Sequence, residues 1–111
     1  MQRFERTAGC GNITKKYLGN SITLSGWVSG RRDHGGLIFI DLRDRSGLMQ
    51  LVFNPDFDER THKNAGDLRS EFVISVTGTV VERSTETINK DLPTGQFELQ
   101  VQNLIIRELL C

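Results

Sequence analysis

The chain has 111 residues, and its 14 basic side chains balance 14 acidic ones, so that it carries no formal net charge at pH 7. This length predicts one domain over residues 1–111, with one core and little room for a deep catalytic cleft. Apolar residues make up 37% of the chain and charged residues 25%, which excludes an intrinsically disordered chain. Zero net charge argues against binding nucleic acid through bulk positive charge, so any polyanion site must be a local basic cluster.

Localisation, redox state and metal binding are predicted from what the sequence lacks. No apolar run approaches the roughly 18 residues of a membrane span, and the opening residues lack the apolar core of a secretory signal. We therefore expect a cytoplasmic protein in which Cys10 and Cys111 are reduced, although a disulfide joining the two ends of the chain stays open. Neither His34 nor His62 has metal-pair spacing with a cysteine, so no metal site is predicted.

The predicted secondary structure is mostly strand. A short helical segment over residues 14–18, ending at Gly19, precedes the first strand. Alternating apolar and polar residues predict strands over 21–28, 37–43, 48–53, 72–81 and 97–106. A turn at 54–56 leads into a helix over 58–68, which places Ala65 and Leu68 on one face.

Three strands, a helix and two strands is the element order of an OB-fold, a five-stranded Greek-key barrel, so the predicted class is all-β. Residues 29–36 and 82–95 are expected to be the loops between strands one and two and between strands four and five. In OB-folds these two loops, with the face of strands two and three, bind oligonucleotides. The sequence contains no phosphate-binding loop, nucleophile elbow or HExxH motif, so no catalytic residue is predicted.

Strand alternation places a phenylalanine, a glutamine and a glutamate on the outside of this barrel. If Ile38, Ile40 and Leu42 face the core, Phe39 points outward together with Asp41 and Arg43. The same alternation places Gln50 and Glu98 outside. An exposed ring can stack on a base, glutamine can read a base edge, and glutamate can accept from the N–H groups of guanine. The alternative is that Phe39 packs under a loop and Gln50 is merely solvated.

A basic pair, Arg31 and Arg32, lies in the first predicted loop between glycines. The planar guanidinium forms forked contacts with phosphates and base edges, and the glycines allow a close approach of the backbone. Asp33 follows and could orient an arginine or cap the turn. The alternative is a solvated turn with no ligand.

Residues 26–53 resemble the opening of bacterial aspartyl-tRNA synthetases; their sequence is GWVSGRRDHGGLIFIDLRDRSGLMQLVF. The similarity continues through LRSEFVISVTGTV (68–80) and INKDLPTGQFEL (88–99). It implies an N-terminal OB-fold that binds the anticodon and that lacks catalytic activity and cofactors of its own. In this family a class II catalytic domain follows, which uses ATP and Mg²⁺ to attach aspartate to tRNA-Asp. We therefore expect an excised domain of a homodimeric aspartate–tRNA ligase.

The resemblance also implies roles for individual residues. Phe39 matches a phenylalanine that stacks on an anticodon base, and Gln50 matches the glutamine that reads the middle uridine. Arg32 matches an arginine that contacts the anticodon, and Glu98 matches a glutamate associated with the first base, a guanine. Gly30 stands where relatives often have another basic residue, which removes one expected phosphate contact.

The sequence leaves two roles open for each of Asn89 and His34. Asn89, in the second predicted loop, is either a tRNA contact or a turn former, and Thr87 replaces an asparagine of some relatives. His34 stands where enzymes strict for tRNA-Asp often have leucine. It therefore either admits tRNA-Asn as a second substrate or is an exposed turn residue without a role.

The main alternative function is a free-standing OB-fold protein that binds single-stranded nucleic acid. Such a protein would carry several surface aromatics and more basic charge than this chain has. An OB domain that binds protein is a third possibility, but it would leave Arg32, Gln50 and Glu98 without a shared purpose.

Overall fold

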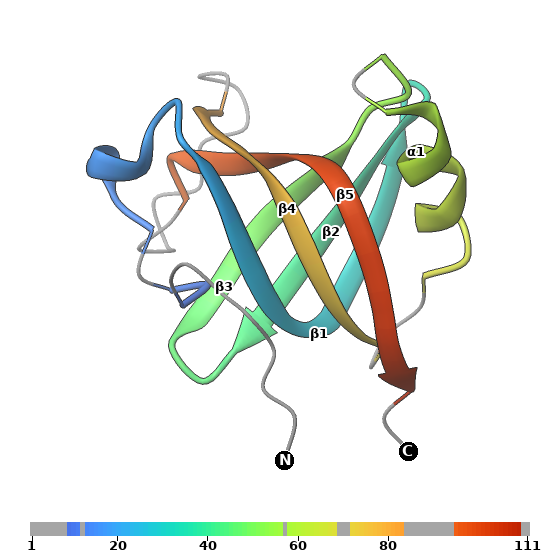
Figure 1. The fold of residues 1–111 in the computed structure, drawn as a ribbon, viewed down its shortest axis with the longest axis horizontal. Coiled ribbons are helices and arrows are strands. Elements are labelled where there is room, and N and C mark those ends of the chain that lie inside the picture. The colour runs from blue at the N-terminus through green and yellow to red at the C-terminus, as the bar shows by residue number, and fades with distance from the viewer. Residues whose placement is uncertain (1–8, 12, 57, 69–71, 84–94, 110–111) are drawn as a thin grey trace.

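The computed structural model describes residues 9–11, 13–56, 58–68, 72–83 and 95–109, and it is a closed five-stranded barrel with strand order β1-β2-β3-β5-β4 (Figure 1). Neighbouring strands are antiparallel except β3 and β5, which are parallel. The predicted all-β class and the OB-fold element order are confirmed. The elements are η1 (Lys15–Tyr17), β1 (Ser21–His34), β2 (Leu37–Asp44), β3 (Gly47–Phe53), α1 (Glu59–Ala65), β4 (Phe72–Glu82) and β5 (Phe97–Leu109).

The prediction of a loop over residues 29–36 is wrong, because β1 continues as far as His34. Residues beyond Val28 pair with β2 across a β-bulge, and only Gly35 and Gly36 form the turn. Both glycines have positive φ, 59° and 82°, as a tight two-residue hairpin turn requires. This part of β1 was not recognised as strand because its sequence is polar and charged.

The helix between β3 and β4 is shorter than predicted but begins where expected. Asp58 caps it, with its carboxylate accepting a hydrogen bond from the backbone N–H of Thr61 at 3.0 Å. The helix ends at Ala65, so Leu68, predicted to share a helical face with it, lies beyond the helix, yet both side chains are buried. No helix among the described residues is long and apolar enough to cross a bilayer.

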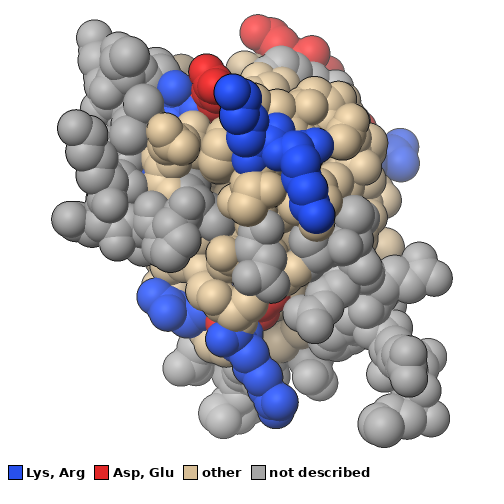
Figure 2. Space-filling view, turned by 90° about the vertical axis from the view of Figure 1, so that its left-hand side faces the viewer, with Lys and Arg blue, Asp and Glu red and all other residues tan. Residues whose placement is uncertain are grey.

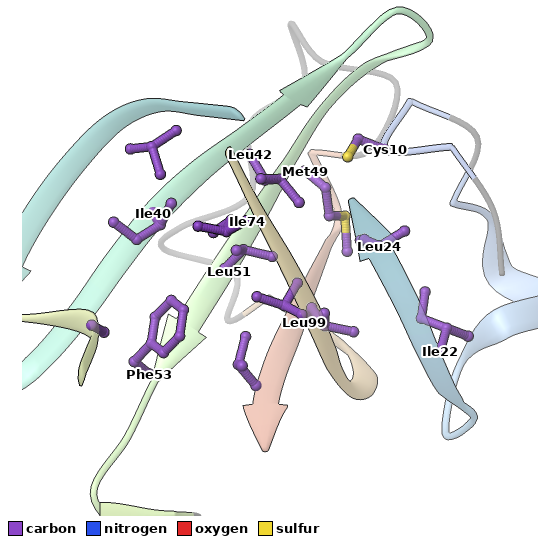
Figure 3. Close-up of a cluster of buried hydrophobic side chains, with 14 of the residues drawn as sticks. Cys10, Ile22, Leu24, Ile40, Leu42, Met49, Leu51, Phe53, Ile74 and Leu99 are labelled. Carbon is purple, nitrogen blue, oxygen red and sulfur yellow. The ribbon is translucent and has the colours of Figure 1, made fainter. Parts of the chain in front are cut away.

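The core fills the barrel, and it contains Ile38, Ile40 and Leu42, as strand alternation predicted. Figure 3 shows Ile40, Leu42, Met49, Leu51, Phe53, Ile74 and Leu99 together in this cluster. Cys10 is buried in the same cluster, whereas Cys111 lies outside the described residues. Residues 84–94, most of the second predicted loop, also lie outside them.

Candidate nucleic-acid interface

Three polar residues of the outer face lie side by side on adjacent strands. Asp41 on β2 is directly opposite Gln50 on β3, and Gln50 is in turn opposite Glu98 on β5. Side chains directly opposite one another on adjacent strands project from the same face of a sheet. Strand register therefore brings together three side chains from distant parts of the sequence.

Arg32 joins these residues into a hydrogen-bonded chain, which we call the Arg32–Glu98 network (Arg32, Asp41, Gln50 and Glu98). The guanidinium of Arg32 donates from Nη1 to Asp41 Oδ2 at 2.8 Å and from Nη2 to Asp41 Oδ1 at 3.1 Å. Nη2 also donates to Gln50 Oε1 at 3.0 Å, and Gln50 Nε2 donates to Glu98 Oε1 at 3.2 Å. The network thus presents a cation, an amide and a carboxylate in a fixed order.

The β-bulge near Ser29 places Arg32 on this face. Val28 is paired with Leu42 and buried, but the register shifts between Val28 and Gly30. Beyond this shift Arg32 lies opposite Phe39, on the outer face, and Arg31 lies opposite Ile40. Without the extra residue, simple alternation from Val28 would turn Arg32 toward the core.

Gln50 is on the predicted face but is not solvated, because only 5% of its surface is exposed. Its amide oxygen accepts from Arg32 and its amide nitrogen donates to Glu98. The alternative of a merely solvated Gln50 is therefore wrong. A buried amide with fixed partners has a defined orientation, which a base-reading group needs.

Arg83, at the end of β4, was missed by the sequence analysis. It is 7% exposed, and its Nε donates to the carbonyl oxygen of Phe97 at 3.0 Å. Burial lowers the pKa of Arg83 from its usual value, whereas the charges of Glu98 and Asp41 raise it. The β4–β5 register, which pairs Val81 with Glu98, brings the two charges near each other, and the sequence alone does not predict that register.

Glu98 has a pKa raised above its usual value, because burial disfavours the carboxylate. The charge of Arg83 and the hydrogen bond from Gln50 act in the opposite direction. Glu98 is thus a partly desolvated acceptor with the positive charge of Arg83 nearby. A carboxylate of this kind gains from N–H donors on a ligand.

Phe39 lies on the next row of the same face. It is opposite Arg32 on β1 and Val52 on β3, and its side chain is half-buried. Phe39 is therefore partly exposed beside the Arg32–Glu98 network. A ring in this position can stack on an unpaired base next to hydrogen-bonding groups.

The remaining predicted site residues do not join this group within the described structure. Arg31 lies on the opposite face of β1, toward α1. The backbone of His34 pairs with Leu37 next to the hairpin turn, but its side chain lies outside the described part of the chain, as does all of Asn89. Asp33 was expected either to orient an arginine or to cap the turn. It orients Arg31.

The surface charge agrees with a local site rather than a broad basic patch. On the face shown in Figure 2, the Lys and Arg side chains of the described residues lie in separate groups and not in one continuous patch. Among the described residues there is no cluster of three or more His, Cys, Asp or Glu side chains that could hold a metal ion.

The barrel and its polar outer face define a nucleic-acid-binding OB domain, and the comparisons agree. The chain belongs to the family described as "OB-fold nucleic acid binding domain", whose sequence model matches residues 22–107. The aspartate–tRNA ligase of Staphylococcus aureus strain Newman is 55% identical over 100 residues, which are 90% of this chain and 17% of that protein. The chain thus spans about a sixth of the length of the curated relatives that it matches.

Solved structures give the same fold. The asparaginyl-tRNA synthetase of Pyrococcus horikoshii, complexed with asparaginyl-adenylate, aligns with a TM-score of 0.78 at 26% identity. The alignment covers 97% of this chain and 23% of that one. An aspartyl tRNA synthetase of Entamoeba histolytica aligns with a TM-score of 0.73 at 16% identity, over 86% of this chain and 20% of that one, a likeness of fold alone.

Proposed function

We propose that this chain is the anticodon-binding domain of an aspartate–tRNA ligase and that the outer face of β2, β3 and β5 holds the anticodon. The observation that carries the proposal is the Arg32–Glu98 network beside the ring of Phe39. The 55% identity to a protein named aspartate–tRNA ligase supports the choice of tRNA.

Three members of the network, and the ring of Phe39 beside it, have matching partners on the anticodon GUC. Glu98 accepts from the Watson–Crick N–H groups of the first base, guanine, which is the only standard base with two adjacent N–H donors on that edge. Gln50 both donates and accepts, as the edge of the middle uracil requires. Phe39 stacks on an anticodon base, and Arg32 contacts the RNA while Asp41 holds its guanidinium.

The complete enzyme is part of this proposal. It activates aspartate with ATP and Mg²⁺ in a catalytic domain and transfers it to tRNA-Asp, and it acts in the cytoplasm as a homodimer. This chain supplies binding energy for the tRNA and discriminates between anticodons, whereas the chemistry takes place in the catalytic domain. His34 and Asn89 complete the anticodon contacts, with His34 nearest the third base and open to tRNA-Asn as well as tRNA-Asp.

The experiment is a titration of the chain with RNA hairpins that carry the anticodon GUC or a single-base variant of it. We expect the tightest binding to GUC and a loss of about 1–3 kcal/mol for a change at the middle base, the range measured for base-edge contacts. Equal affinity for all hairpins would refute anticodon recognition. It would favour the alternative of a sequence-tolerant single-strand binder, against which the zero net charge argues.

A further inference from the structure

The hairpin end of β1 and β2 extends past the main barrel. The pairing of β1 with β4 ends at Trp27, whereas its pairing with β2 continues to His34. The outer half of β1 therefore has one neighbouring strand instead of two. A two-stranded hairpin is marginally stable without further packing.

Arg31 connects this hairpin to the end of α1. Its Nη1 donates to the carbonyl oxygens of Gly66 at 2.7 Å and Leu68 at 3.2 Å, just beyond the helix. The positive guanidinium also lies at the end of the helix where cations are favoured. One side chain thereby joins segments 35 positions apart in the sequence.

Asp33 fixes the other edge of the same guanidinium. Arg31 donates from Nε to Asp33 Oδ1 and from Nη2 to Asp33 Oδ2, each at 2.9 Å. This contact raises the pKa of Arg31 and lowers that of Asp33 from their usual values. Both edges of the guanidinium are therefore used inside the protein.

His62, on α1, makes a second connection at the turn itself. Its Nε2 lies 2.7 Å from the carbonyl oxygen of Gly36, a hydrogen bond in which the ring N–H donates. Figure 1 shows α1 beside the hairpin end of β1 and β2. The hairpin is thus held at two points, on the strand by Arg31 and at the turn by His62.

We propose that Arg31 and His62 are positioning residues: they brace the β1–β2 hairpin against α1 and so hold Arg32 and Phe39 in place for RNA. This inference rests on the proposed function. It assigns Arg31 an internal contact in place of the phosphate or base-edge contact expected of the Arg31–Arg32 pair. Arg32 and Phe39 are opposite each other on the braced part of the hairpin, so a shift of the hairpin moves both.

The test compares Arg31→Ala, Arg31→Lys and His62→Ala with Arg60→Ala as the control, since Arg60 is an exposed residue of α1. Lysine keeps the positive charge but cannot reproduce the forked contact of arginine. Two measurements are made on each variant. Amide hydrogen exchange without RNA follows the β1–β2 and β1–β4 ladders, and titrations with GUC and GAC hairpins at several salt concentrations follow binding.

We expect all three brace variants to exchange faster in the β1–β2 hairpin and normally in the β1–β4 ladder. They should bind GUC about fivefold to tenfold more weakly, the effect of roughly one net hydrogen bond. Their preference for GUC over GAC should also fall, which a uniform loss of folded protein would not cause. The salt dependence of binding should stay unchanged, and Arg60→Ala should exchange like the unaltered chain.

Two results would overturn the proposed positioning role of Arg31 and His62. One is an unchanged exchange rate in the hairpin of Arg31→Ala and His62→Ala. The other is native binding by Arg31→Lys together with a salt slope lowered by about 0.7 in Arg31→Ala, the behaviour of a phosphate contact on a single strand. If Phe39→Ala weakened binding while the brace variants did not, the brace would fail and the proposed function would stand. If the unaltered chain did not prefer GUC, both would fail.

Discussion

Arg31 and Arg32 are neighbours in the chain, yet their guanidinium groups lie on opposite faces of β1. Arg32 donates to Asp41 and Gln50 on the outer face, and Arg31 donates to the backbone at the end of α1. The bulge that follows Val28 decides which arginine faces which way. The two arginines therefore have different roles because the bulge adds one residue to the strand before them.

Phe39→Ala should weaken binding of the GUC hairpin by about 1–3 kcal/mol, the contribution of one stacked base. The reason is that the ring is half-buried on the outer face, opposite Arg32 and Val52. Fluorescence or calorimetric titration measures the loss, and urea unfolding checks the fold. Unfolding without a separable binding defect would show that Phe39 belongs to the core.

Gln50→Ala should reduce discrimination at the middle base more than it reduces overall affinity. Gln50 is buried and oriented by Arg32 and Glu98, so its loss removes a directional contact with a base edge. The measurement is the ratio of dissociation constants for GUC and GAC hairpins. Gln102→Ala, an exposed glutamine of β5, is the control and should leave that ratio unchanged. Equal losses on both hairpins for Gln50→Ala would rule out base reading.

Much of this site could be predicted from strand alternation, because alternation depends only on local sequence. It correctly placed Phe39 and Glu98 on the outer face and Ile40 in the core. Two features could not be predicted in this way. A bulge reverses alternation without a distinct sequence pattern, so Arg31 and Arg32 were both placed in a loop and their opposite directions were not predicted. Arg83 lies near Glu98 only through the β4–β5 register, which depends on the whole barrel.

Glu98 should make the stability of the chain depend on pH. Burial raises its pKa in the folded state, so the folded chain holds this proton more tightly than the unfolded chain does. The stability that Glu98 contributes is therefore complete below the unfolded pKa and is lost as the pH rises through the folded pKa. The free energy of unfolding of the unaltered chain, minus that of Glu98→Gln, should fall over this interval.

Urea unfolding at a series of pH values measures this difference. Glu82→Gln, which replaces an exposed glutamate at the end of β4, serves as the control. A difference that grew with pH instead would mean that Arg83 and Gln50 stabilise the carboxylate more than burial penalises it.

Gly78→Ala should destabilise the barrel by about 1–3 kcal/mol, the usual cost of overpacking. A Cβ at this position would lie 2.2 Å from the carbonyl oxygen of Gln100 and 2.9 Å from the Cα of Val101, so the backbone of β5 would have to move. Gly30 is a matched control, since both glycines adjoin a register shift between strands. A Cβ at Gly30 meets only Asp41 Oδ2, at an ordinary 3.5 Å, and Gly30→Ala should unfold like the unaltered chain. Equal urea midpoints for both variants would contradict the steric argument.

His34→Leu should sharpen the preference for GUC over GUU, the anticodons of tRNA-Asp and tRNA-Asn, which differ only in the third base. An imidazole both donates and accepts, so it can serve cytosine or uracil, whereas leucine offers the base only its shape. The backbone of His34 pairs with Leu37 at the end of the hairpin, on the segment that Arg31 and His62 hold. We expect the unaltered chain to bind the two hairpins with affinities within about threefold of each other. We expect His34→Leu to weaken binding of the GUU hairpin alone by about fivefold to tenfold, the effect of one net hydrogen bond.

Aspartylation of purified tRNA-Asp and tRNA-Asn by the complete enzyme is the matching activity measurement. Strict charging of tRNA-Asp alone by the unaltered enzyme would remove the role of His34 in admitting tRNA-Asn and would leave anticodon binding by the Arg32–Glu98 network untouched.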